Sequence, residues 1–111
     1  MEDYKKTEEK VIAEIKKQIT ENAIFLYIKG TDKMPQCGFS AKVVRAIVAC
    51  GKPFKFVNVL ERPDIRAILP RFADWPTFPQ VYVNGELIGG CDIVTEMHET
   101  GELRELLASV K

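Results

Sequence analysis

The side chain best suited to chemistry is the thiol of Cys37, in the segment PQCGFS at residues 35–40. This segment follows an apolar run and precedes a helical pattern, so the thiol is expected at a helix N-terminus. Unpaired backbone N–H groups and the helix dipole stabilise a thiolate there, which makes it a nucleophile or a metal ligand. Ser40 stands where a Cys-x-x-Cys pair has its second thiol. Any disulfide of Cys37 must therefore involve another molecule or a distant cysteine.

The segments that would position Cys37 alternate between two patterns. Apolar residues at helical spacing predict helices, and short apolar runs predict strands. The pair Asn84-Gly85 between two such runs is a strong hairpin signal, and Pro63 suits an early helical position. The predicted helices span residues 7–20, 39–50, 62–69, 93–99 and 102–110, and the predicted strands span residues 23–28, 54–59, 80–83 and 86–88.

Three residues are expected to shape helix ends. Gly51 supplies a C-terminal stop for the helix that follows Cys37. Asp92 is expected to cap the helix at residues 93–99. Pro70, late in its helical run, is expected to end or distort that helix.

This order of elements predicts an α/β fold. Strands separated by helices favour parallel pairing through right-handed crossovers, and the terminal hairpin adds an antiparallel pair. We therefore expect a mixed four-stranded sheet flanked by helices on both faces. In open α/β sheets the binding site lies beyond the carboxyl ends of the strands, which is where the loop carrying Cys37 leaves the first strand.

Composition narrows the class of protein. The 111 residues, 46% of them apolar, suit one compact domain. Sixteen basic and 16 acidic residues balance, so neither a nucleic acid nor an anionic membrane is an expected partner. No stretch approaches the ~20 apolar residues that span a bilayer. Three cysteines are too few for a disulfide framework and fit a reducing compartment, so a cytoplasmic location is expected.

Four segments resemble the signature segments of the monothiol glutaredoxins with a CGFS site. They are KGT at 29–31, PQCGFS at 35–40, WPTFPQ at 75–80 and GGCD at 89–92, in the family's order. The resemblance runs from about residue 7 to residue 108. It implies a thioredoxin-like fold of the glutaredoxin type, and a single glutaredoxin domain over residues 1–111 with no added thioredoxin-like domain.

The resemblance implies that Cys37 ligates a [2Fe–2S] cluster shared with a second subunit, with glutathione as co-ligand. The implied assembly is a homodimer bridged by the cluster, or a heterodimer with a BolA-like protein. Such a cluster needs four ligands, whereas this chain has one cysteine placed like a ligand. Two chains and two glutathione thiols would complete the set.

The resemblance also implies a glutathione site. Lys29 and Arg66 would contact the glycine carboxylate, for which arginine is the better bidentate donor. The backbone of Phe78 would pair with the tripeptide cysteine, and a cis bond between Phe78 and Pro79 would expose the Phe78 amide for that pairing. The γ-glutamyl end would meet residues 91 and 92. The implied glutathione contacts are Lys29, Cys37, Arg66, Phe78, Cys91 and Asp92.

For the other residues capable of chemistry, the sequence favours structural roles. Cys50 occupies an apolar position near a helix end and is expected in the core. His98 lies among polar residues and is expected in solvent, and Trp75 is expected to pack. Cys91 has two interpretations, a contact through its backbone N–H or a disulfide with Cys37 under oxidation, and the first is favoured.

Two functions use the same residues. The first is an iron–sulfur carrier for cluster assembly, transfer to recipient apoproteins and iron homeostasis. The second is a glutathione-dependent oxidoreductase that reduces protein–glutathione mixed disulfides with Cys37 as its catalytic thiol. A BolA-binding adaptor without a cluster is a third interpretation. The resemblance favours the carrier, with weak or no general oxidoreductase activity.

Overall fold

The computed structural model describes residues 2–110, and the side chains of residues 7–110. Helices and strands follow one another in the predicted order. The elements are α1 (Glu2–Glu21), β1 (Ile24–Ile28), α2 (Gly38–Ala49), β2 (Lys55–Asn58), α3 (Pro63–Ala73), β3 (Gln80–Val83), β4 (Glu86–Gly89), α4 (Cys91–Thr100) and α5 (Glu102–Ala108).

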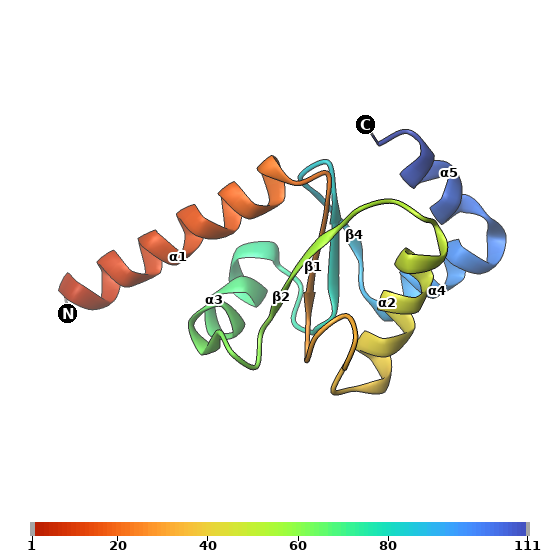
Figure 1. Ribbon diagram of the computed structural model, residues 1–111. Coiled ribbons are helices and arrows are strands. Elements are labelled where there is room, and N and C mark those ends of the chain that lie inside the picture. The colour runs from red at the N-terminus through yellow and green to blue at the C-terminus, as the bar shows by residue number, and fades with distance from the viewer. Residues whose placement is uncertain (1, 111) are drawn as a thin grey trace.

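The four strands form the predicted mixed sheet, in the order β2-β1-β3-β4. β1 and β2 are parallel, whereas β1–β3 and β3–β4 are antiparallel. The hairpin turns at Asn84 and Gly85, whose φ angles of 52° and 84° are those of a type I′ turn. Helices α1 and α3 lie on one side of the sheet, and α2, α4 and α5 lie on the other (Figure 1).

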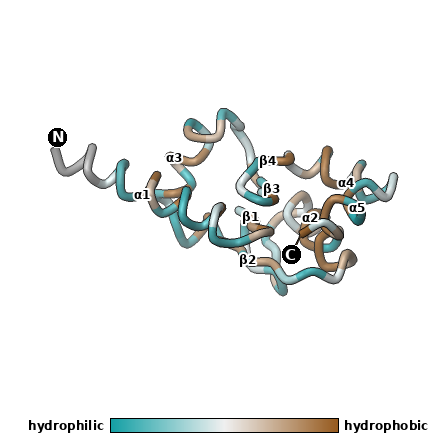
Figure 2. Tube along the Cα trace, turned by 90° about the horizontal axis from the view of Figure 1, so that it is seen from above, coloured by the Kyte–Doolittle hydropathy of each residue, from teal (hydrophilic) through white to brown (hydrophobic). Residues whose placement is uncertain are grey.

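The sheet separates two hydrophobic clusters. One includes Ile15 of α1 and Leu69 of α3, and the other includes Ile47 of α2 and Leu103 of α5. All five residues of β1 are buried, because this strand contributes side chains to both clusters. Hydrophobic residues gather along α2 and the strands, whereas α1 mixes hydrophilic with hydrophobic residues, as expected for a helix with one solvated face (Figure 2).

All four strands bring a connecting segment to the same edge of the sheet. β1 and β2 end there side by side, with Ile28 opposite Asn58. β3 begins there, because Gln80 pairs with Tyr27, and β4 ends there at Gly89. The segments at residues 29–37, 59–66, 75–79 and 90–92 therefore meet beyond the carboxyl ends of the parallel strands, as the sequence predicts.

Helix α2 ends as predicted, since Gly51 follows it with φ +73°. The expected effect of Pro70 is wrong in part, because α3 continues through this residue to Ala73. A proline costs the helix one N–H···O=C bond, and Phe72 and Ala73, which follow it, keep α3 packed against the cluster that includes Ile15 and Leu69. No described helix is long and apolar enough to cross a membrane.

The expected cap of the next helix is also wrong. α4 begins at Cys91, with Gly90 and not Asp92 as its N-cap. The reason is that the carbonyl of Gly90 already accepts the N–H of Val94 at 3.0 Å, so the helix starts two residues early. Asp92 lies within the first turn, where a carboxylate is favoured by the helix dipole.

Candidate functional site

Cys37 is the N-cap residue of α2, which confirms its predicted place at a helix N-terminus. Its Sγ accepts a hydrogen bond from the backbone N–H of Ser40 at 3.3 Å. The hydroxyl of Ser40 also lies 3.3 Å from the sulfur. Cys37 is half-buried, so the thiol is both held and accessible.

The surroundings of Cys37 favour its thiolate. Burial raises the pKa of the thiol, but the Ser40 hydroxyl, the backbone N–H groups of Ser40 and Phe39, and the charge of Lys29 lower it more. The net result is a pKa below the ordinary value of a cysteine. A half-buried thiolate at a helix N-terminus can attack a disulfide or bind a soft metal ion.

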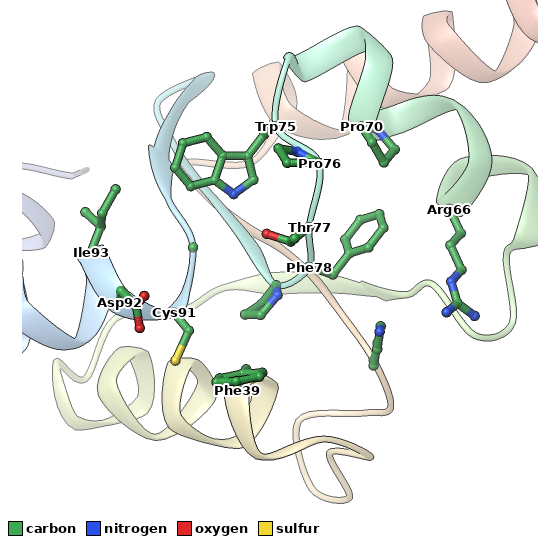
Figure 3. A pocket seen from close by; sticks show the side chains of 13 residues that line it. Phe39, Arg66, Pro70, Trp75, Pro76, Thr77, Phe78, Cys91, Asp92 and Ile93 are labelled. Atoms are coloured by element: carbon green, nitrogen blue, oxygen red, sulfur yellow. The ribbon is translucent and has the colours of Figure 1, made fainter.

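A pocket of about 680 Å³ opens at the same edge of the sheet. Figure 3 shows Arg66 on one side, Cys91 and Asp92 on the other, and Thr77 and Phe78 between them. Of the six residues predicted to contact glutathione, five line this pocket: Lys29, Arg66, Phe78, Cys91 and Asp92. The sixth, Cys37, is not a lining residue, but Phe39, two residues on, is.

The two ends of the pocket differ in charge. Arg66 lies at one end (Figure 3), Lys29 is a second cation in the lining, and neither has an ion-pair partner among the described side chains. Arg62, one turn before Arg66, by contrast forms ion pairs with Glu14 and Asp64 at 2.7 and 3.0 Å. The opposite end is the N-terminus of α4, whose first backbone N–H groups have no helical acceptors.

The floor of the pocket is the segment before β3. The peptide bond between Phe78 and Pro79 is cis, as predicted. The buried side chain of Gln80 holds this segment, since its Nε2 donates to the carbonyls of Trp75 and Thr77 at 3.1 and 3.3 Å. Tyr82 donates its hydroxyl proton to Gln80 Oε1 at 2.9 Å, which fixes the orientation of the amide.

Because Gly90 has no side chain, the indole of Trp75 can pack against it and form one wall of the pocket. A Cβ at position 90 would lie 3.0 Å from the Pro79 oxygen and 3.3 Å from Trp75 Nε1. Trp75 therefore packs as predicted, although it also lines the pocket. Its indole N–H is buried and has no partner among residues 7–110.

Sequence reasoning missed three polar residues that hold these loops. The sequence indicates Ser40 only as the residue in place of a second thiol, yet Ser40 is fully buried against Cys37. Asn58 accepts the N–H groups of Gly30 and Leu60 at 2.9 and 3.0 Å, and Gln80 holds the segment before β3. The available signal was a polar residue within or next to an apolar strand run, in FVNV for Asn58 and at the start of QVYV for Gln80.

The other residues with reactive or metal-binding side chains lie largely as predicted. Cys50 is half-buried and packs against the cluster of α2, α4 and α5, and His98 is exposed. Cys37, Cys50 and Cys91 are free thiols. Within the described residues, no three His, Cys, Asp or Glu side chains form a group able to hold a metal ion.

Comparison with known proteins agrees with this geometry. The family model described as Glutaredoxin matches residues 24–88. Glutaredoxin 4 of Escherichia coli strain K12 is 58% identical over 96 residues, covering 86% of this chain and 84% of the relative. Glutaredoxin 4 of Haemophilus ducreyi is 60% identical, covering 86% and 90%.

Solved structures extend the agreement to three dimensions. The solution structure of reduced poplar apo GrxS14 superposes with a TM-score of 0.77 at 42% identity, covering 88% of this chain and 90% of that one. The thioredoxin-like fold expected from the sequence is therefore confirmed. With one cysteine in its CGFS segment, the chain belongs to the glutaredoxin family, in its monothiol class.

Proposed function

We propose that this glutaredoxin carries a [2Fe–2S] cluster that two chains hold together with two glutathione molecules, and passes it to recipient apoproteins. The observation that carries the proposal is a single thiol at the N-cap of α2. It lies beside a pocket that has the cation of Arg66 at one end and offers helix N–H groups at the other. No second thiol on α2 competes for the ligand position.

The pocket suits glutathione because both ends of this tripeptide carry a carboxylate. The guanidinium of Arg66 and the ammonium of Lys29 pair with the glycine carboxylate. The N–H groups at the start of α4, at Cys91 and Asp92, receive the γ-glutamyl carboxylate. The backbone of Phe78 pairs with the central cysteine, which leaves the glutathione thiol near Cys37.

The donor set supports a shared cluster. Thiolates are the usual ligands of [2Fe–2S] centres, and four are needed. The described part of one chain gathers no such group, so the missing ligands come from glutathione and a second chain. A cluster completed by exchangeable thiols suits transfer to another protein better than permanent storage.

The face around the thiol suits a protein partner. Met34 and Phe39 are 68% and 60% exposed, near Cys37 in sequence, and apolar side chains of this kind favour protein contacts. The proposed partners are a second copy, a BolA-like protein or a recipient iron–sulfur apoprotein. Three free thiols fit a reducing compartment, so the proposal includes a cytoplasmic location.

The lowered pKa of Cys37 supports a second candidate, the reduction of protein–glutathione mixed disulfides. The Cys37 thiolate would attack the glutathione sulfur, forming a Cys37–glutathione disulfide and releasing the protein thiolate, which takes a proton from water. A second glutathione thiolate would then attack the glutathionyl sulfur. That step releases Cys37 as thiolate and forms glutathione disulfide, so glutathione supplies the electrons.

Anaerobic reconstitution with ferrous iron, sulfide and glutathione tests the proposal. The wild type and Cys50→Ser are expected to develop visible sulfide-to-iron absorption, whereas Cys37→Ser stays colourless with an unchanged far-ultraviolet circular dichroism spectrum. Full cluster occupancy in Cys37→Ser would contradict the ligand set. A colourless wild type that turns over a glutathionylated protein would favour the oxidoreductase.

A further inference from the structure

Ser40 joins two parts of the site that belong to different elements. Its side chain lies in the first turn of α2 and is 0% exposed. In the part of the chain that the structure describes, its Oγ has two partners. The backbone N–H of Lys29 donates to it at 3.1 Å, and the sulfur of Cys37 lies 3.3 Å away.

The chemistry of a hydroxyl lets it serve both partners at once. A serine Oγ has one proton and two acceptor lone pairs. The Lys29 N–H can only donate, so it occupies one lone pair. A Cys37 thiol donates its S–H to the other lone pair, and a Cys37 thiolate receives the hydroxyl proton. The hydroxyl therefore keeps both contacts whether or not the sulfur carries its proton.

A second thiol at this position would lose this arrangement, because sulfur is a weak acceptor for the Lys29 N–H. We propose that Ser40 is a positioning residue whose single buried hydroxyl fixes the sulfur of Cys37 relative to the backbone of Lys29. The side chain of Lys29 lines the pocket, so one hydroxyl also sets the spacing between the thiol and a pocket cation. The use of that spacing to bind glutathione rests on the proposed function. The two contacts of the Ser40 hydroxyl, by contrast, are present in the chain without glutathione.

Amide hydrogen exchange of the free protein tests the contact with Lys29. The variants are Ser40→Ala and Ser40→Cys. The second is close in size to the wild type, is kept reduced so that it forms no disulfide with Cys37, and still tests the contact if the alanine variant fails to fold. The control is Thr31→Ala, which removes a hydroxyl that accepts the Met34 N–H at 2.9 Å in the neighbouring loop. The exchange rate of Lys29 is divided by that of Leu26, in the middle of β1, so that a general loss of stability cancels.

We expect this ratio to rise about five- to tenfold in both Ser40 variants, which is the usual worth of one hydrogen bond. Thr31→Ala is expected to leave the ratio within about twofold, because the Lys29 amide keeps its acceptor. An unchanged ratio in the Ser40 variants would overturn the proposal.

Alkylation by iodoacetamide tests the contact with the sulfur. Mass spectrometry gives the rate at Cys37 relative to Cys50 in the same chain, a thiol at the far end of α2. Ser40→Ala is expected to lower this ratio about two- to threefold, because the thiolate loses one of its hydrogen-bond donors and its greater nucleophilicity offsets about half of that loss. A ratio equal to that of the wild type would also overturn the proposal. Both measurements omit glutathione and iron, so their outcome is independent of whether the chain carries a cluster.

Discussion

Replacing Gln80 by leucine is expected to lower the free energy of unfolding by about 2–4 kcal/mol. The amide is fully buried and makes three hydrogen bonds, two to backbone carbonyls of the segment before β3 and one from the hydroxyl of Tyr82. Leucine has a similar volume and can make none of these bonds.

The magnitude follows from what the substitution leaves unpaired. Tyr82 is only 3% exposed, and burial raises the pKa of its hydroxyl to about 12, so water replaces the lost partner poorly. An unpaired buried hydroxyl costs about 1–3 kcal/mol, and each of the two carbonyl bonds adds about 0.5–1 kcal/mol. Thr77 is exposed, so water satisfies its carbonyl in part. The loss is a large share of the 5–15 kcal/mol typical of a domain's stability.

A double-mutant cycle in urea measures this loss. Tyr82→Phe removes the hydroxyl that Gln80→Leu leaves unpaired, so the double variant is expected to be more stable than the sum of the single losses by about 1–2 kcal/mol. Gln36→Leu is the matched control, since its amide is exposed and its contact with the Met34 carbonyl is long at 3.4 Å. A loss below about 0.5 kcal/mol for Gln80→Leu, or strict additivity, would show that the buried amide of Gln80 does not stabilise the segment before β3.

Three further predictions concern the ion pairs and the pocket. Arg62→Met should lower the free energy of unfolding in urea by about 1–2 kcal/mol, whereas Arg71→Met, at an arginine that is 65% exposed, should change it by less than about 0.5 kcal/mol; equal losses would contradict this. Hydrogen bonds from Arg62 hold the pKa of its two carboxyl partners below the ordinary value, so the stability they contribute is present above their unfolded pKa and is lost as the pH falls. The wild type should therefore lose more stability than Arg62→Met between about pH 5 and pH 2, and parallel curves would show that the pairs contribute nothing. Gly90→Val should weaken glutathione binding about tenfold by calorimetry, because the new side chain displaces Trp75, and unchanged affinity would show that this wall is not part of the site.

The order of elements could be predicted because apolar runs and helical spacing are local signals. Helix ends were harder to predict, since they depend on weaker terms. The predicted start of α1 at Thr7 was late, because residues 2–10 carry no apolar stripe and only their Glu and Lys residues, good helix formers, favour a helix from Glu2. The cap of α4 at Gly90 depends on one backbone hydrogen bond from Val94, and no side chain in the sequence indicates that bond.

The thiol and the pocket residues could be predicted because short sequence segments carry them. The polar residues that hold the loops could not, because their partners come from other elements. Ser40 accepts an N–H from a residue 11 positions away, and Asn58 accepts one from a residue 28 positions away. Burial of such side chains follows from the packing of the whole sheet and not from a local pattern.

Native mass spectrometry of the reconstituted protein tests whether two chains share one cluster, because it counts chains, glutathione, iron and sulfide in one particle. We expect a species of two chains, two glutathione molecules and one [2Fe–2S] cluster, which separates into monomers when glutathione is removed. A cluster held by one chain, or by two chains without glutathione, would contradict the shared ligand set.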